Sequence, residues 1–207
     1  AEPSKGVLKD AFYYQLAANI RRFKGMSCRN EIDAFRSIDI KGGAEQWRSV
    51  KPEFAHYIGS TKKRDADGWL GTHYDGKAVR NDIKLSKIAY DDKFIYFLAE
   101  TVDDLTPPED GEWMRLLIDT DEGGLSPNWE GFEYIINRSS PVSGKTSVEK
   151  SLGGFSWEKV GDAEIEIAGK LLQIKVDRKL LGFEPDGSVP HMNFKWADDN
   201  IRSGDIM

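Results

Sequence analysis

Tryptophan side chains are the residues of this sequence with the clearest capacity for binding chemistry. The chain has six tryptophans among 207 residues. Trp69, Trp113 and Trp129 fall in polar connections or where a connection meets an expected strand, whereas Trp47 and Trp196 are expected in the core. A flat indole can lie against the apolar C–H face of a sugar ring. We therefore expect these three tryptophans to stack against a carbohydrate, with core packing as the alternative for each.

Polar side chains near these tryptophans could hold the hydroxyl groups of a sugar. Carboxylates, amides and guanidinium groups accept or donate the hydrogen bonds that hydroxyls need. We select Asn81, Arg115 and Glu130 as polar partners because they come from the same connections and the same strand as the tryptophans. These six residues form the predicted carbohydrate-binding site.

A group of oxygen donors follows the expected strand that ends at Asp119. Asp121 lies two residues further on, and Asn128 and Glu130 belong to the same connection. Ca²⁺ prefers carboxylate and carbonyl oxygens, so Asp119 and Asp121 are candidate ligands for this ion. The spacing does not match an EF-hand, and a solvated acidic turn is the alternative. No pattern in the sequence predicts an organic cofactor.

The common sequence signatures of catalysis are missing from this chain. It contains no G-x-S-x-G, no phosphate-binding loop of the GxxxxGK[ST] type and no H-E-x-x-H. The histidines His56, His73 and His191 are far apart in the sequence and lie in unlike contexts. We therefore expect no enzymatic activity. Carboxylates are numerous, so a glycoside hydrolase with two facing acids is left open.

Composition restricts the class of partner. Thirty-five acidic residues against 29 basic residues give a net charge of −6, the opposite of the basic excess that drives binding to nucleic acid. No stretch approaches the ~20 apolar residues that a membrane-spanning helix needs. The single cysteine, Cys28, excludes an intrachain disulfide and a zinc site built on thiolates. We expect an oligosaccharide or polysaccharide as partner, with no nucleic acid and no membrane span.

The pattern of apolar residues predicts one helix followed by many strands. Over residues 8–24 the apolar residues recur every three or four positions, the period of a helix with one apolar face. Further along, short runs of β-branched and aromatic residues alternate with Gly, Pro, Asp and Asn. Strands are expected at residues 37–40, 54–58, 82–90, 94–99, 113–119, 132–136, 146–152, 165–167, 172–176 and 191–196.

These strands predict an all-β fold, a jelly-roll-like antiparallel β-sandwich with an N-terminal α-helix. The apolar run 94–99 suits a strand that is covered on both faces, and Ala168-Gly169-Lys170 suits the turn of a hairpin. Two long connections, 59–81 and 120–131, contain Trp69 and Trp129. Loops of this length are commonly functional, and for this reason we expect the binding site there.

Several motifs resemble those of family 9 carbohydrate-binding modules. The segment SIDIKGGAEQW (37–47) resembles the opening of these modules, and KIAYDDKFIYF (87–97) resembles a pair of consecutive strands. ETVDD (100–104) is similar to the acidic turn that follows, and WMRLLID (113–119) to the next strand, which ends in Asp. Residues 12–25 resemble the helix that precedes such modules in larger bacterial polysaccharide-processing proteins. We therefore divide the chain into residues 1–35, a helix and linker, and 36–207, the module.

The resemblance implies a sugar-binding β-sandwich, commonly attached to a glycoside hydrolase and often stabilised by structural calcium. It also implies a secreted, periplasmic or cell-surface location in a bacterium. It transfers no ligand-binding residue, because the first binding aromatic of characterised members falls where this chain has residues 107–110, Pro-Pro-Glu-Asp. We expect a non-catalytic carbohydrate-binding module associated with polysaccharide degradation. The alternative is a structural or interaction domain of a glycoside hydrolase-type protein that has lost the sugar site.

Overall fold

The computed structural model describes most of the chain after residue 32. It covers residues 16–17, 19–20, 23–25, 33–59, 65–67, 71, 73–75, 80–109, 111–121, 128 and 131–198. The chain divides into two compact units, residues 1–32 and residues 33–207. Among the described residues, no helix has both the length and the apolar character needed to cross a bilayer.

Most of the predicted N-terminal helix lies outside the described residues. Its described positions 16–17, 19–20 and 23 have helical backbone conformation, and the Lys24 N–H donates to the Ile20 carbonyl at 3.0 Å. Phe23 is 92% exposed. Because most residues of 8–24 lie outside the described part of the chain, the helix over 8–24 stays a prediction.

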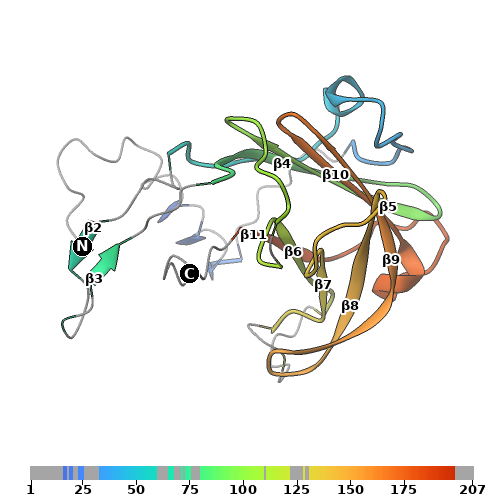
Figure 1. Cartoon of the computed structure of the whole chain (residues 1–207). Helices are drawn as coiled ribbons and strands as arrows, with labels where there is room; N and C mark the ends of the chain where they lie inside the picture. The colour runs from blue at the N-terminus through green and yellow to red at the C-terminus, as the bar shows by residue number, and fades with distance from the viewer. Residues whose placement is uncertain are drawn as a thin grey trace. The chain divides into compact units, whose positions relative to one another are not determined.

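The second unit is built from antiparallel strands, which confirms the all-β class (Figure 1). A sheet of nine strands has the order β1-β4-β5-β10-β9-β8-β7-β6-β11, and β2 and β3 pair separately with each other. The strands are β1 (Glu53–Ala55), β2 (Asp65–Asp67), β3 (His73–Asp75), β4 (Ile83–Tyr90), β5 (Phe94–Thr101), β6 (Arg115–Asp119), β7 (Tyr134–Ile136), β8 (Lys145–Gly153), β9 (Ser156–Ala168), β10 (Leu171–Asp177) and β11 (Asn193–Ala197). Two short 3₁₀ helices, η1 (Ala44–Trp47) and η4 (Arg178–Leu181), complete the described elements.

The nine-stranded sheet curls until its two ends approach each other. β1 and β11 are the first and last strands in the sheet order, yet the rings of Phe54 and Phe194 lie 5.4 Å apart in an edge-to-face contact. Phe194 also contacts the buried Phe97 of β5 at 5.6 Å. The inner face of the curl holds the main hydrophobic core, to which β4 to β11 contribute. The predicted jelly-roll-like β-sandwich arrangement of these strands stays a prediction.

Strand β5 is apolar on both faces because both of its faces are covered. Ile95, Phe97 and Ala99 belong to the main core. Tyr96 and Leu98 point to the opposite face and belong to a second, smaller hydrophobic cluster. Burial on both faces removes the selection for alternating polar residues, so the prediction of a doubly covered strand at 94–99 is confirmed.

The hairpin predicted around Ala168-Gly169-Lys170 is confirmed. β9 and β10 pair in register from Ala168 opposite Leu171 to Glu164 opposite Lys175. Gly169 has a φ of 58°, a left-handed conformation that glycine adopts without steric cost. The tight turn thus fixes which side chains of the two strands lie opposite each other.

The strand predicted at 37–40 is wrong, because these residues cover the sheet instead of joining it. The Gln173 side chain donates from Nε2 to the Ile40 carbonyl at 2.8 Å and accepts from Trp47 Nε1 at 2.8 Å. Ile38, Ile40 and Trp47 are buried in the second hydrophobic cluster. One buried amide thus holds residues 37–50 over the outer face of β5 and β10, and the core position expected for Trp47 is confirmed.

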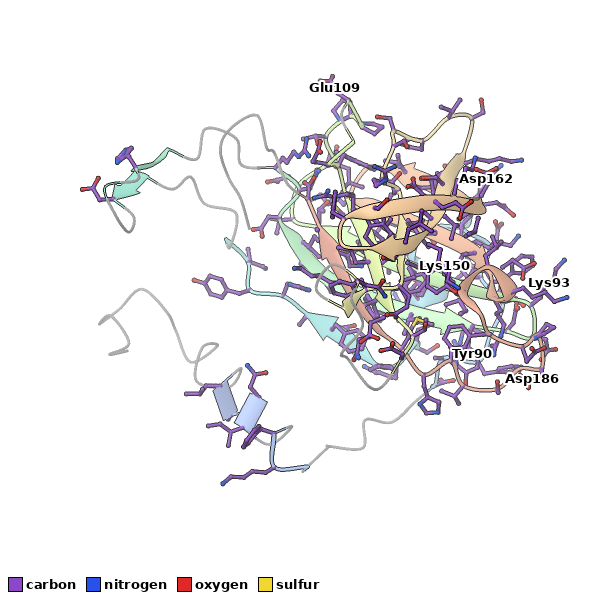
Figure 2. All side chains as sticks on the ribbon, turned by 90° about the horizontal axis from the view of Figure 1, so that it is seen from below. Tyr90, Lys93, Glu109, Lys150, Asp162 and Asp186 are labelled. Carbon is purple, nitrogen blue, oxygen red and sulfur yellow. The ribbon has the colours of Figure 1, made fainter. Side chains whose placement is uncertain are left out.

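A buried arginine organises the chain after β10. Arg178 is fully buried, and its guanidinium donates to the carbonyls of Glu184 and Ser188 and of Asp91. It also lies 5.9 Å from the Tyr90 ring centroid. Tyr90 and the nearby Asp186 lie in the same part of the unit (Figure 2). These contacts connect the segment after η4 to the β4–β5 turn.

Replacement of Gln173 tests the hold on residues 37–50. We expect Gln173→Ala to lower the free energy of unfolding by about 2 to 5 kcal/mol, because Trp47 Nε1 and the Ile40 carbonyl would be left buried without their partner. Urea unfolding measures the change. Gln46→Ala is the matched control: its bonds to the Asp39 backbone are solvent-exposed, so about 1 kcal/mol or less is expected. Equal losses in the two variants would contradict the buried hold.

Candidate functional site

Trp113 lies in the main hydrophobic core, which overturns its predicted role in stacking. Only 1% of the residue is exposed. Its indole Nε1 donates to Thr106 Oγ1 at 3.1 Å. Met114, the next residue, has a φ of 43° and turns the chain into β6. Because the indole fills the core, no face of the ring is available to a sugar.

Asn81 is also buried and holds the protein together rather than a ligand. Its Nδ2 donates to Thr106 Oγ1 at 3.0 Å and to Asp198 Oδ2 at 2.8 Å, while its Oδ1 accepts from the Thr106 N–H at 2.8 Å. Arg80 Nε lies 2.9 Å from Asp198 Oδ1, with 11% and 6% of the two side chains exposed. This polar network connects the start of β4, the segment before β6 and the end of β11.

The remaining predicted sugar ligands divide into one buried residue and three outside the described residues. Arg115 is buried at the start of β6, so its selection as a ligand for an outside molecule is corrected as well. Trp69, Trp129 and Glu130 fall outside the described residues. Of the six predicted residues the structure describes three, Trp113, Asn81 and Arg115, and all three are buried.

Asp119 and Asp121 do lie together, and a third carboxylate joins them. One carboxylate oxygen from each of Asp119, Asp121 and Glu133 lies within 4.8 Å of the other two. Glu133 accepts from the Thr120 N–H at 2.8 Å and from Asn128 Nδ2 at 3.1 Å. Glu133 thereby bonds two residues of the 120–131 connection, Thr120 and Asn128.

Strand pairing explains why these three acids meet. Asp119 is the last residue of β6, and Glu133 directly precedes β7, which pairs with β6 through Ile118 opposite Tyr134. On the other side, Asn193 of β11 lies opposite Asp119 and donates to its Oδ2 at 3.0 Å. Three carboxylates at one edge repel one another unless a cation or protons intervene. The set consists of hard oxygen donors, which fits Ca²⁺ better than a softer metal.

A recess of about 140 Å³ lies beside this acidic cluster. It is lined by Asp119, Thr120, Asp121, His191, Met192 and Asn193. The recess has room for an ion with its bound water, since a water molecule occupies about 30 Å³ in the liquid. The candidate Ca²⁺ ligands Asp119 and Asp121 lie in one cluster; the sequence prediction did not include Glu133, and calcium binding stays a prediction.

Exposed aromatic and apolar side chains gather at the end of the sheet where the acidic cluster lies. Leu152 is 64% and Phe155 53% exposed, at the turn from β8 to β9. The rings of Phe155 and Trp157 meet edge to face at 6.0 Å. We call Leu152, Phe155 and Trp157 the β8–β9 tip.

The backbone of the 120–131 connection reaches the β8–β9 tip. Asn128 forms a single bridge with Gly154, within the β8–β9 turn. Trp129 is the next residue in the sequence. Trp129, a predicted stacking residue, thus directly follows Asn128, which is paired with Gly154 beside the aromatic tip. Sequence reasoning missed Phe155 and Trp157 because nothing in the sequence shows that residues 128 and 154 are adjacent.

Asn137 fits the sequence pattern for N-glycosylation but cannot accept a glycan in this fold. It is 1% exposed, and its Nδ2 donates to the carbonyls of Trp113 and Met114 at 3.0 and 3.2 Å. Thr146 Oγ1 donates to Asn137 Oδ1 at 2.8 Å. The side chain therefore serves the core rather than the surface.

Comparisons of this chain with protein-family models, with curated proteins and with solved structures found no match. The resemblance to family 9 carbohydrate-binding modules therefore rests on the motifs in the sequence and stays a prediction.

We expect the buried Asp198 to make the stability of the fold depend on pH. Burial raises the pKa of this carboxyl, and the attraction of Arg80 and the hydrogen bonds from Met114 and Asn81 offset only part of the rise. Since the folded pKa lies above the unfolded value of about 3.9, proton uptake by Asp198 stabilises the fold as pH falls. We expect the stability advantage of the wild type over Asp198→Asn to grow between pH 7 and pH 4.5.

Urea unfolding of both proteins at the two pH values measures this difference. Asp103→Asn, an exposed acid outside the network, controls for the loss of one negative charge. A wild-type advantage that shrinks on acidification would show that Asp198 prefers its charged form in the fold.

Proposed function

We propose that this chain is a non-catalytic carbohydrate-binding module associated with polysaccharide degradation. Its antiparallel all-β architecture suits such a module, and the motif resemblance supports the same assignment and a jelly-roll arrangement of the strands. The N-terminal helix would join the module to a larger protein, with a glycoside hydrolase domain as the partner. A secreted, periplasmic or bacterial cell-surface location belongs to the same proposal.

The β8–β9 tip is the observation that carries the proposal. Phe155 is 53% exposed and meets the partly buried Trp157 edge to face, and an exposed aromatic ring can pack against the C–H face of a sugar. Polar side chains of the same sheet end, among them Asn128 and Asp121, supply hydrogen-bonding groups for hydroxyls. Trp129 follows Asn128 in the sequence and is proposed as a further stacking residue, with Glu130 as its polar partner. Trp69, from the other long connection, remains a proposed contact.

We also propose Ca²⁺ as a structural ion at Asp119, Asp121 and Glu133. These residues would bind the ion through carboxylate oxygens, and the ion would neutralise their mutual repulsion. Because Glu133 also accepts hydrogen bonds from Thr120 and Asn128, an ion held there would stiffen the connection that leads to Trp129.

A structural or interaction domain is the second candidate, and the burial of Trp113 favours it. A tryptophan selected as a ligand contact is sealed in the core, and Asn81 and Arg115 are buried as well. In this alternative the exposed apolar side chains of the β8–β9 tip would pack against another protein domain. The two candidates differ in whether the tip recognises a sugar or a protein surface.

Calorimetric titration with a panel of oligosaccharides tests the proposed function. We expect Phe155→Ala and Trp157→Ala each to weaken binding by roughly tenfold or more, because loss of an aromatic contact costs about 1 to 3 kcal/mol. Val142→Ala is the control, since Val142 is an exposed apolar residue in a different turn. Absence of heat with every glycan would instead favour the interaction domain.

Thermal unfolding with and without Ca²⁺ tests the metal site. At 100 times its dissociation constant the ion would stabilise the fold by about 2.7 kcal/mol, which corresponds to about 5 to 10 °C for a chain of this size. Asp121→Asn should abolish the shift, whereas Asp103→Asn, outside the cluster, should retain it. A shift of equal size in Asp121→Asn would place the ion elsewhere.

A further inference from the structure

A groove of about 350 Å³ lies on the outer face of the sheet, away from the residues of the β8–β9 tip. Residues 37–41 form one side of it, and Glu164 of β9 and Lys175 of β10 form the other. The volume falls within the range of about 300 to 1,000 Å³ that is typical of small-ligand pockets. The groove exists because the covering segment 37–50 lies over β5 and β10 without extending across β9.

The side of the groove on β9 and β10 is a cross-strand ion pair. Glu164 and Lys175 lie opposite each other in the β9–β10 register, with Lys175 Nζ 2.8 Å from Glu164 Oε1. Lys175 Nζ also lies 4.3 Å from the centroid of the Phe94 ring. The ring and the carboxylate together fix the position of the ammonium group, while half of the Glu164 side chain is exposed and can accept further hydrogen bonds.

The opposite wall is held in place before any ligand arrives. Ser37 Oγ donates to Asp91 Oδ2 at 2.6 Å, and Gln173 Nε2 donates to the Ile40 carbonyl at 2.8 Å. Gln46 pairs with both the N–H and the carbonyl of Asp39, at 3.0 and 2.8 Å. A wall fixed in this way loses little conformational entropy when it binds a ligand.

The charges around the groove balance. Asp39 and Glu164 are acidic, and Lys41 and Lys175 are basic. Such a lining offers both acceptors and donors, as the hydroxyl groups of a sugar require, and it has no excess charge to attract an anion. We propose that this groove is a second glycan-binding site, which takes a neutral disaccharide-sized unit. The inference rests on the proposed function, because it extends the same ligand class to another face.

Titration of groove variants with defined disaccharides tests this site. The probes are cellobiose, xylobiose and maltose, which are neutral, and digalacturonic acid, which is anionic. Lys175→Met keeps an unbranched apolar side chain but removes the ammonium group that lies over Phe94, and Glu164→Gln keeps the shape of the side chain. We expect each variant to weaken binding of a neutral disaccharide by about tenfold, the effect of one lost charged hydrogen bond.

Lys84→Met is the matched control for these variants. Lys84 forms a cross-strand ion pair of the same kind, with Nζ 2.7 Å from Glu100 Oε1, between β4 and β5 and outside the groove lining. Its removal should leave affinity unchanged. Thermal unfolding of every variant identifies any that fail to fold. Mapping of ligand-induced NMR shifts in the wild type, expected at residues 37–41, 164 and 175, provides a readout independent of the variants.

The outcomes separate this inference from the proposed function. If Phe155→Ala and Trp157→Ala abolish binding while both groove variants bind as the wild type does, the groove site is wrong and the function stands. Tighter binding of digalacturonic acid than of every neutral disaccharide would overturn the predicted ligand class. Absence of binding to any sugar would overturn the function and the groove site together.

Discussion

The hydrogen bonds of Gln173 are the interaction on which the second face of the sheet depends. Strand β5 presents apolar side chains in both directions, so each face needs a cover. The curl of the sheet covers the inner face. On the outer face, one buried amide bonds both Trp47 and the Ile40 carbonyl and so holds residues 37–50 in place. Without that segment, the second hydrophobic cluster would face water.

The curl has a consequence for how polar groups are distributed. Contacts between Phe54, Phe194 and Phe97 bring the two ends of the sheet together. Around the start of β6, Asn81, Asn137 and Asp198 form buried hydrogen bonds with side-chain and backbone groups of the chain. Buried polar groups require partners of this kind. A polar residue in a connection is therefore not, for that reason alone, a ligand-binding residue.

Two accessible surfaces among the described residues differ in their chemistry. The β8–β9 tip is aromatic and adjoins the acidic cluster of Asp119, Asp121 and Glu133. The outer groove is polar, and its charges balance. Sugars combine apolar faces with hydroxyl edges, so both surfaces suit the same ligand class. A protein partner would use the tip and would have no need for the groove.

The sequence by itself determined the all-β class, the doubly covered strand at 94–99, the β9–β10 hairpin and the proximity of Asp119 to Asp121. These features depend on side-chain period, turn residues and short separation, all of which are local. Only the tertiary structure decided that Trp113, Asn81 and Arg115 are buried, that residues 37–40 cover the sheet, and that Glu133 joins the acidic cluster. The physical reason is that burial and clustering depend on strand pairing and curl, which bring together residues separated by long connections and have no local signal in the sequence.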